Sequence, residues 1–154
     1  VWARRGQRPL ARGHQRFQWV YVFGFVRPAT GDVVWFLADA VNTAMFNRIL
    51  AAFARDVGAG PDKIVVLVLD GAGWHVAKDL QVPDGIRLEF LPPYSPELQP
   101  AEHLWPVINE PLANLHFHTL ADLDEVLAER CCDLANDPDR IKSSTQFHWW
   151  PAFI

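Results

Sequence analysis

The segment Lys63–Leu69, KIVVLVL, constrains the fold most, because it is apolar after its first residue and is followed at once by Asp70-Gly71. A short continuous apolar run that ends in turn residues predicts a strand buried on both faces. Such a strand needs a covering layer on each side, which indicates an α/β protein. Open α/β sheets gather functional residues just beyond their strand ends, so Asp70 is a candidate site residue.

A second carboxylate, Glu102, stands beyond the next predicted strand, residues 86–90, and a loop that contains Pro92 and Pro93. Each acid alone has an ordinary explanation, since Asp-Gly is a common turn and an acid in the first turn of a helix is favoured by the helix dipole. Two carboxylates at neighbouring strand ends also suit a divalent metal held by oxygen ligands. The pair therefore predicts a Mg²⁺ site in which Mn²⁺ can substitute.

The remaining pattern predicts a hairpin of two strands and several helices. The strands cover residues 17–26 and 33–39 on either side of the turn RPATGD, and both are apolar enough to be covered on both faces. Helices are expected at 44–57, after a cap at Asn42 or Thr43, at 76–80, from Pro100 onward, and at 120–134, after a cap at Thr119. Pro106 and Pro111 should bend or interrupt the third of these. The order predicts a three-layer α/β fold.

Composition limits the class of protein. The 154 residues suit a single domain, and a 50% hydrophobic content with seven Trp and ten Phe excludes a disordered chain. No apolar run approaches the roughly 18 residues of a spanning helix, and no signal-peptide pattern opens the chain, so a cytoplasmic protein without membrane contact is expected. The two cysteines, Cys131 and Cys132, are adjacent and are predicted to stay reduced.

The net charge of −4 hides an uneven distribution. Residues 1–31 contain six arginines and no acid, whereas the remainder holds eight basic and 18 acidic side chains. A basic edge beside an acidic body suits a metal-dependent nuclease, in which guanidinium groups contact phosphates and carboxylates hold metal. A solvated arginine-rich terminus is the alternative. The candidate DNA contacts are Arg4, Arg5, Arg8 and Arg12.

The stretch from Val65 to Trp105 resembles the catalytic core of the mariner-like DDE superfamily of transposases and endonucleases, in its bacterial insertion-sequence branch. The resemblance extends from Trp2 to about Leu127, with Gly71 and Gln99 each standing where asparagine is usual. The motif residues that carry it are Asp70, His75, Leu91-Pro92-Pro93-Tyr94-Ser95-Pro96, Leu98-Gln99-Pro100, Glu102 and Trp105.

This resemblance implies a ribonuclease-H-like fold, a mixed sheet flanked by helices, and metal-dependent cleavage and transfer of DNA strands at mobile-element ends. It implies that Asp70 and Glu102 are catalytic metal ligands, and that double-stranded DNA with terminal repeats is bound by a homodimer. Around the carboxylates, the supporting residues are expected to be His75, Tyr94 and Gln99.

The family's first catalytic Asp belongs to a strand that would precede the opening VWARRG phrase. Residues 1–154 are therefore interpreted as one catalytic domain, truncated at its N-terminus and without the helix-turn-helix region, and are expected to bind metal weakly and to be inactive alone. Asp39 is the alternative third ligand within the chain. A non-catalytic remnant that binds DNA or a partner, and another ribonuclease-H-like nuclease, are the rival functions. The second rival requires another acid on the last helix, for which the candidates are Asp122, Asp124 and Glu125.

Overall fold

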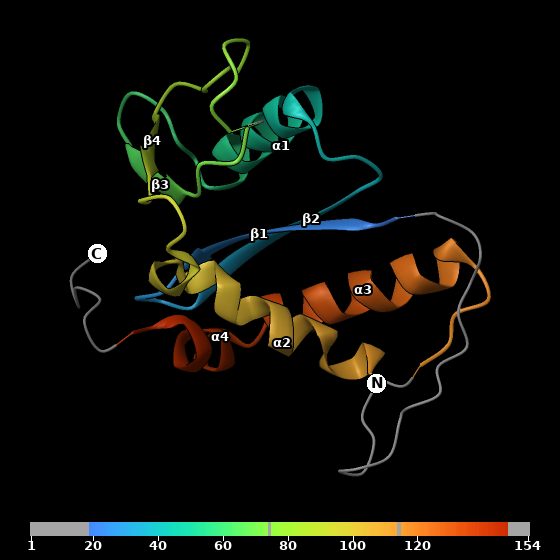
Figure 1. Cartoon of the computed structure of the whole chain (residues 1–154). Helices are drawn as coiled ribbons and strands as arrows, with labels where there is room; N and C mark the ends of the chain where they lie inside the picture. The colour runs from blue at the N-terminus through green and yellow to red at the C-terminus, as the bar shows by residue number, and fades with distance from the viewer. Residues whose placement is uncertain (1–18, 74, 114, 148–154) are drawn as a thin grey trace.

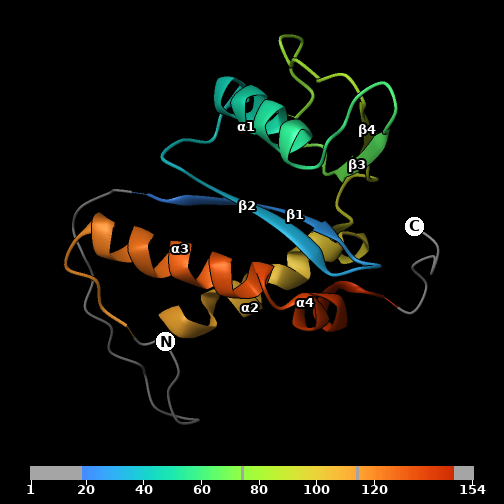
Figure 2. The same cartoon turned by 180° about the vertical axis from the view of Figure 1, so that it is seen from behind.

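The computed structural model describes residues 19–73, 75–113 and 115–147. A two-stranded hairpin forms the middle layer, with one helix and a second pair of strands on one side and three helices on the other (Figure 1; Figure 2, from behind). The α/β prediction is confirmed in this arrangement. The elements, in order, are β1 (Tyr21–Arg27), β2 (Asp32–Ala38), α1 (Thr43–Asp56), β3 (Val65–Leu69), β4 (Ile86–Phe90), the 3₁₀ helices η1 (Pro96–Leu98) and η2 (Pro100–His103), α2 (Leu104–Asn109), η3 (Glu110–Leu112), α3 (Leu120–Ala135) and α4 (Pro138–Thr145).

The predicted hairpin forms an antiparallel pair, with Tyr21 opposite Ala38 and Arg27 opposite Asp32. Its turn closes through the amide of Gly31, which donates to the carbonyl of Arg27 at 2.9 Å. Gly31 has a φ of +82°, which favours glycine, and a Cβ built there would lie 1.9 Å from the carbonyl oxygen of Pro138. The turn is therefore seated directly on the first residue of α4.

Alternate residues of the hairpin enter two separate hydrophobic cores, as a period of two requires. Phe23 and Phe25 point into an upper core with α1, β3 and β4, whereas Val22 and Trp35 pack against a lower core formed by α2, α3 and α4. Both faces are thus covered, as predicted. The rings of Phe25 and Phe53 stack with their centroids 4.2 Å apart, which joins β1 to α1.

Helix α1 begins where the sequence predicts, because the side chain of Asn42 accepts the amide hydrogen of Met45 at 2.9 Å. The helix predicted at 76–80 is wrong, since this segment is a series of turns and bends. Its backbone is held from outside by Asn47 of α1, which donates to the carbonyl of Asp79 and accepts from the amide of Gln81. A contact across more than 30 residues thus overrides a weak local preference.

Strands β3 and β4 are parallel, with Val65 opposite Ile86 and Leu69 opposite Phe90. Among the described residues they form a sheet of their own, separate from the sheet of β1 and β2. The strands are therefore arranged as one antiparallel pair and one parallel pair. The expectation that β3 is buried on both faces is therefore wrong: Val66 is 57% exposed. Val66 lines a hollow between β3 and β1 that the described elements do not fill, which leaves its side chain exposed.

The segment that begins at Pro100 is broken into η2, α2 and η3, as its prolines predict. Helix α3 begins with the predicted capping box, in which Thr119 and Asp122 exchange hydrogen bonds between side chain and backbone. Helix α4 was not predicted, although Asp137 before Pro138 is a helix-start pattern. None of the helices in the described part of the chain combines the length and apolarity needed to cross a membrane.

Candidate active site

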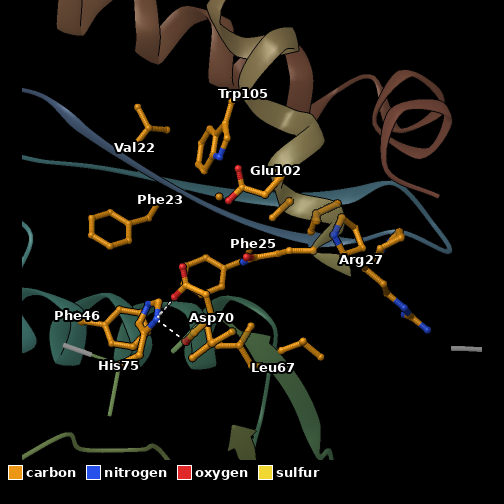
Figure 3. A pocket seen from close by; sticks show the side chains of 18 of the residues that line it. Val22, Phe23, Phe25, Arg27, Phe46, Leu67, Asp70, His75, Glu102 and Trp105 are labelled. Carbon is orange, nitrogen blue, oxygen red and sulfur yellow. Dashed lines mark hydrogen bonds and ion pairs between the residues drawn. The ribbon is translucent and has the colours of Figure 1, made fainter. Parts of the chain in front are cut away.

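A groove with a volume of about 330 Å³ runs between the hairpin and the second pair of strands. One wall is the whole of β1, and the opposite wall is Val66–Leu69 of β3 with Asp70. Each strand has its pairing partner on the far side, β2 for β1 and β4 for β3, so the two strand edges facing the groove pair with no other strand of the described residues. Figure 3 shows Asp70 and His75 on one side of this groove and Glu102 with Trp105 on the other.

Asp70 follows directly on β3, as predicted, and its side chain is 55% exposed. Its Oδ1 atom accepts the backbone N–H of Ala72 at 3.2 Å and lies 2.6 Å from Nδ1 of His75. The other carboxylate oxygen, Oδ2, accepts no hydrogen bond from any residue within the described ranges. The carboxylate is therefore fixed through one oxygen while the second oxygen is left for a ligand.

His75, which the sequence predicts to support Asp70, is 6% exposed and lies in direct contact with Asp70. Its Nδ1 faces two acceptors, the Oδ1 and the carbonyl oxygen of Asp70, the latter at 3.0 Å. A nitrogen between two acceptors carries the hydrogen, which assigns the proton to Nδ1. The ring also packs on Phe46 of α1, with centroids 4.8 Å apart. No local pattern in the sequence pointed to Phe46, because the contact joins elements 29 positions apart.

Glu102 enters from the opposite core. It lies in the first turn of η2, where its amide donates to the carbonyl of Gln99 at 3.1 Å, and its neighbours Leu104 and Trp105 pack in the lower core. The side chain is half-buried and, among the described residues, its carboxylate forms no hydrogen bond or ion pair. The fold thus brings Asp70 and Glu102, which are 32 positions apart in the sequence, to the lining of one groove.

A smaller hollow, about 180 Å³ in volume, adjoins the groove under the loop Leu91–Pro96. The residues that line both spaces are Asp70, Gln99 and Glu102. Tyr94 lies on the rim of the smaller hollow with its side chain fully exposed and a φ of +58°. Tyr94 therefore lies beside the carboxylates along this hollow, with its side chain exposed to solvent.

The other candidate residues lie elsewhere. Asp39, Asp124 and Glu125 line a separate hollow near Trp19, and Asp122 is engaged in the cap of α3. Asp39, the alternative third ligand, therefore does not line the hollows that contain Asp70 and Glu102, and neither do the candidate acids of α3. Arg27 does line the groove and is exposed. The predicted DNA contacts lie outside the described residues: Arg4, Arg5, Arg8 and Arg12.

The donor chemistry fits a hard divalent cation. Asp70 offers an oxygen without a protein partner and Glu102 a half-buried carboxylate, and Mg²⁺ is commonly held by one or two carboxylates that are completed by water and substrate oxygens. Within the described ranges, no group of three or more His, Cys, Asp or Glu side chains is arranged to hold a metal. Within the described residues the pair therefore offers two carboxylates to such a cation.

The cysteines take no part in this site. Both are free, Cys131 buried and Cys132 exposed. Burial, with a smaller contribution from the neighbouring thiolate of Cys132, raises the pKa of Cys131 from 9.0 to about 11. At neutral pH Cys131 is a protonated core residue of α3.

The match of the DDE superfamily endonuclease model to residues 1–124 places the chain in that family. The uncharacterized protein y4pE/y4sA of Sinorhizobium fredii (strain NBRC 101917 / NGR234) is 37% identical over 135 residues, which are 85% of this chain and 96% of that protein. A chain in the crystal structure of the Mos1 strand transfer complex has a similar fold, with a TM-score of 0.54 and 19% identity. The similarity covers 96% of this chain but half of the Mos1 chain, and it confirms the ribonuclease-H-like fold.

Proposed function

We propose that this chain is the catalytic portion of a transposase that cleaves and joins DNA strands at the ends of a mobile element, with Asp70 and Glu102 as its metal ligands. The observation that carries the proposal is that two carboxylates 32 residues apart line one groove at the end of β3, one of them oriented by a buried histidine. Family membership and the likeness to the Mos1 chain support the same reaction class.

The roles of the residues follow from their contacts. Asp70 presents Oδ2 to a Mg²⁺ or Mn²⁺ ion while His75 and the amide of Ala72 hold Oδ1, so the ligand is oriented before metal arrives. Glu102 approaches from the opposite core. When bound, the metal lowers the pKa of a water or hydroxyl nucleophile and stabilises the leaving oxygen. Arg27, exposed on the groove wall, is placed to neutralise a DNA phosphate.

The third carboxylate is supplied from outside residues 1–154, so these residues are inactive alone. Arg4, Arg5, Arg8 and Arg12 contact double-stranded DNA, and the enzyme works in the bacterial cytoplasm as a homodimer on paired element ends.

The test is nicking of a plasmid that carries the DNA flanking the coding sequence, with Mg²⁺ or Mn²⁺. It compares residues 1–154 with a chain extended upstream to the next Asp-bearing strand, each also carrying Asp70→Asn or Glu102→Gln. We expect activity in the extended chain alone, abolished by either substitution. The matched control is Glu97→Gln, which removes an exposed acid of the neighbouring η1 and should leave activity unchanged.

Nicking that survives both substitutions would overturn the assignment of the carboxylates. Activity in residues 1–154 alone would place the third ligand inside this chain, and Asp39 would be the first residue to replace. A second function, a non-catalytic domain that binds DNA or a partner, is favoured by one observation, the absence of a three-carboxylate group from the described residues. Inactivity of both chains, with DNA binding retained, would establish it.

A further inference from the structure

Tyr94 is the one fully exposed large aromatic side chain among the described residues. Burying an aromatic ring is favourable, and a ring of this size usually packs on the body of a protein or hydrogen-bonds through its hydroxyl group. The Tyr94 side chain does neither within the described structure. An exposed ring at the mouth of a hollow is a surface that another molecule can cover.

The backbone holds this ring outward at a cost. Tyr94 has a φ of +58°, the one positive φ of a non-glycine residue in the described part of the chain. A left-handed conformation costs about 1–3 kcal/mol for such a residue. Pro93 precedes Tyr94, and Pro96 follows two positions later, each with its φ fixed by its ring, so the loop has little freedom to turn Tyr94 inward. The loop thus constrains the backbone from which the Tyr94 side chain projects.

Its position ties the ring to the carboxylates. Tyr94 lines the hollow whose other lining residues include Asp70 and Glu102, so a phosphate held at that pair has its neighbouring nucleotide near the loop. Aromatic rings bind nucleic acids by stacking on bases, which tolerates any sequence because every base has a flat face. In a duplex these faces are already stacked, so a base reaches such a ring once it is unpaired.

We propose that Tyr94 stacks on an unpaired nucleobase that flanks the phosphate bound at Asp70 and Glu102. This inference rests on the proposed function, because it takes the carboxylate pair as the position of the reacting phosphate. It makes Tyr94 a contact for DNA ends that carry unpaired nucleotides, and it gives the exposed aromatic ring beside the site a role.

The experiment measures binding with Mg²⁺ present, because the two carboxylates would hold a phosphate through a metal ion, and residues 1–154 alone are expected not to cleave. Residues 1–154 are titrated into two fluorescein-labelled DNA probes at one fixed salt concentration: a blunt duplex, and the same duplex with a single-stranded 3′ overhang of about four nucleotides. 2-Aminopurine in the overhang gives a second readout, since its fluorescence is quenched on stacking. The parent chain is expected to prefer the overhang DNA and to quench the 2-aminopurine.

Tyr94→Gly suits the positive φ and removes the ring, and it should weaken binding of the overhang DNA by about five- to 150-fold while binding of the blunt duplex is unchanged. Tyr94→Phe keeps the ring and should retain the preference. The matched control is Trp19→Gly, which removes another exposed aromatic, 63% accessible, from a different hollow and should change neither probe.

The inference would be overturned if the parent chain showed no preference for the overhang DNA. It would also be overturned if the Tyr94→Gly variant kept both the preference and the quenching. Neither outcome would affect the assignment of the carboxylates, which the nicking assay tests independently. Loss of binding to both probes by Tyr94→Gly would also overturn it, because stacking on an unpaired base cannot affect a blunt duplex. If the parent chain bound neither probe, both this inference and the proposal that residues 1–154 bind DNA would be overturned.

Discussion

Replacing Gly31 by alanine should destabilise the protein far more than the same replacement at Gly58. Both glycines have positive φ, +82° and +66°, so each alanine carries the left-handed cost of about 1–2 kcal/mol. A Cβ at position 58 meets nothing within 4 Å, whereas at position 31 it lies 1.9 Å from the Pro138 carbonyl oxygen and 2.7 Å from its carbon. Comparing the two variants therefore separates the cost of the left-handed backbone, which both share, from the cost of displacing α4, which only Gly31→Ala has.

The steric part follows from the distances. A carbon and a carbonyl oxygen approach to about 3.3 Å at closest, so α4 must withdraw by about 1.4 Å. That movement loosens Ile141, which is completely buried and whose full burial is worth about 1.5–3 kcal/mol. Losing about half of this adds roughly 1 kcal/mol, so we expect about 3 kcal/mol for Gly31→Ala and about 1–2 kcal/mol for Gly58→Ala.

Urea unfolding monitored by circular dichroism measures both values, with an unchanged m-value as the check that the comparison is two-state. Equal losses of unfolding free energy in the two variants, within about 0.5 kcal/mol, would refute the reasoning, because they would mean that α4 does not rest on the turn. A larger loss for Gly58→Ala would refute it as well.

Three further results are expected. His75→Phe keeps a ring against Phe46 but removes the donor to Asp70, so nicking by the extended chain should fall about 10- to 100-fold, and unaltered nicking would count against an orienting histidine. At pH 8 iodoacetamide should alkylate the exposed Cys132 before the buried Cys131, and equal alkylation rates would contradict this. Burial raises the pKa of Cys131 from 9.0 to about 11, so the unfolding free energy should fall as the pH rises through this range. An unfolding free energy that stays constant over the range would contradict the raised pKa. Arg130→Met removes a half-buried guanidinium that donates to the backbone of α2 and should cost about 2 kcal/mol in urea unfolding, whereas a loss below about 0.5 kcal/mol would show the contact to be dispensable.

Local chemistry made much of the fold predictable. Asn42 and Thr119 cap helices through bonds to residues three positions away, and the alternating hairpin residues belong to a pattern with a period of two, so both features are complete within a few residues of sequence. The broken segment after Pro100 was predictable for the same reason, because proline acts on its own turn.

What the sequence could not supply depends on distant partners. Residues 76–80 have a helix-compatible pattern, yet Asn47 holds the neighbouring backbone in turns. The positive φ of Tyr94 could not be predicted from the sequence, because a positive φ is expected at glycine and uncommon at other residues. At the site, the positions of Asp70 and Glu102 followed from strand ends and a motif, whereas the choice of Oδ1 as the anchored oxygen required the fold. Whether the pair is catalytic stays a prediction.

The two hydrophobic cores have a consequence for how the carboxylate pair responds to ligands. Asp70 is attached to the upper core through β3, and Glu102 to the lower core through η2, so the separation of the two side chains measures how the outer layers sit across the hairpin. An ion held by both, as proposed above, would link the two outer layers across the hairpin. Ion binding and the relative position of the layers would then be thermodynamically linked: movement of either layer would weaken ion binding, and the bound ion would oppose that movement.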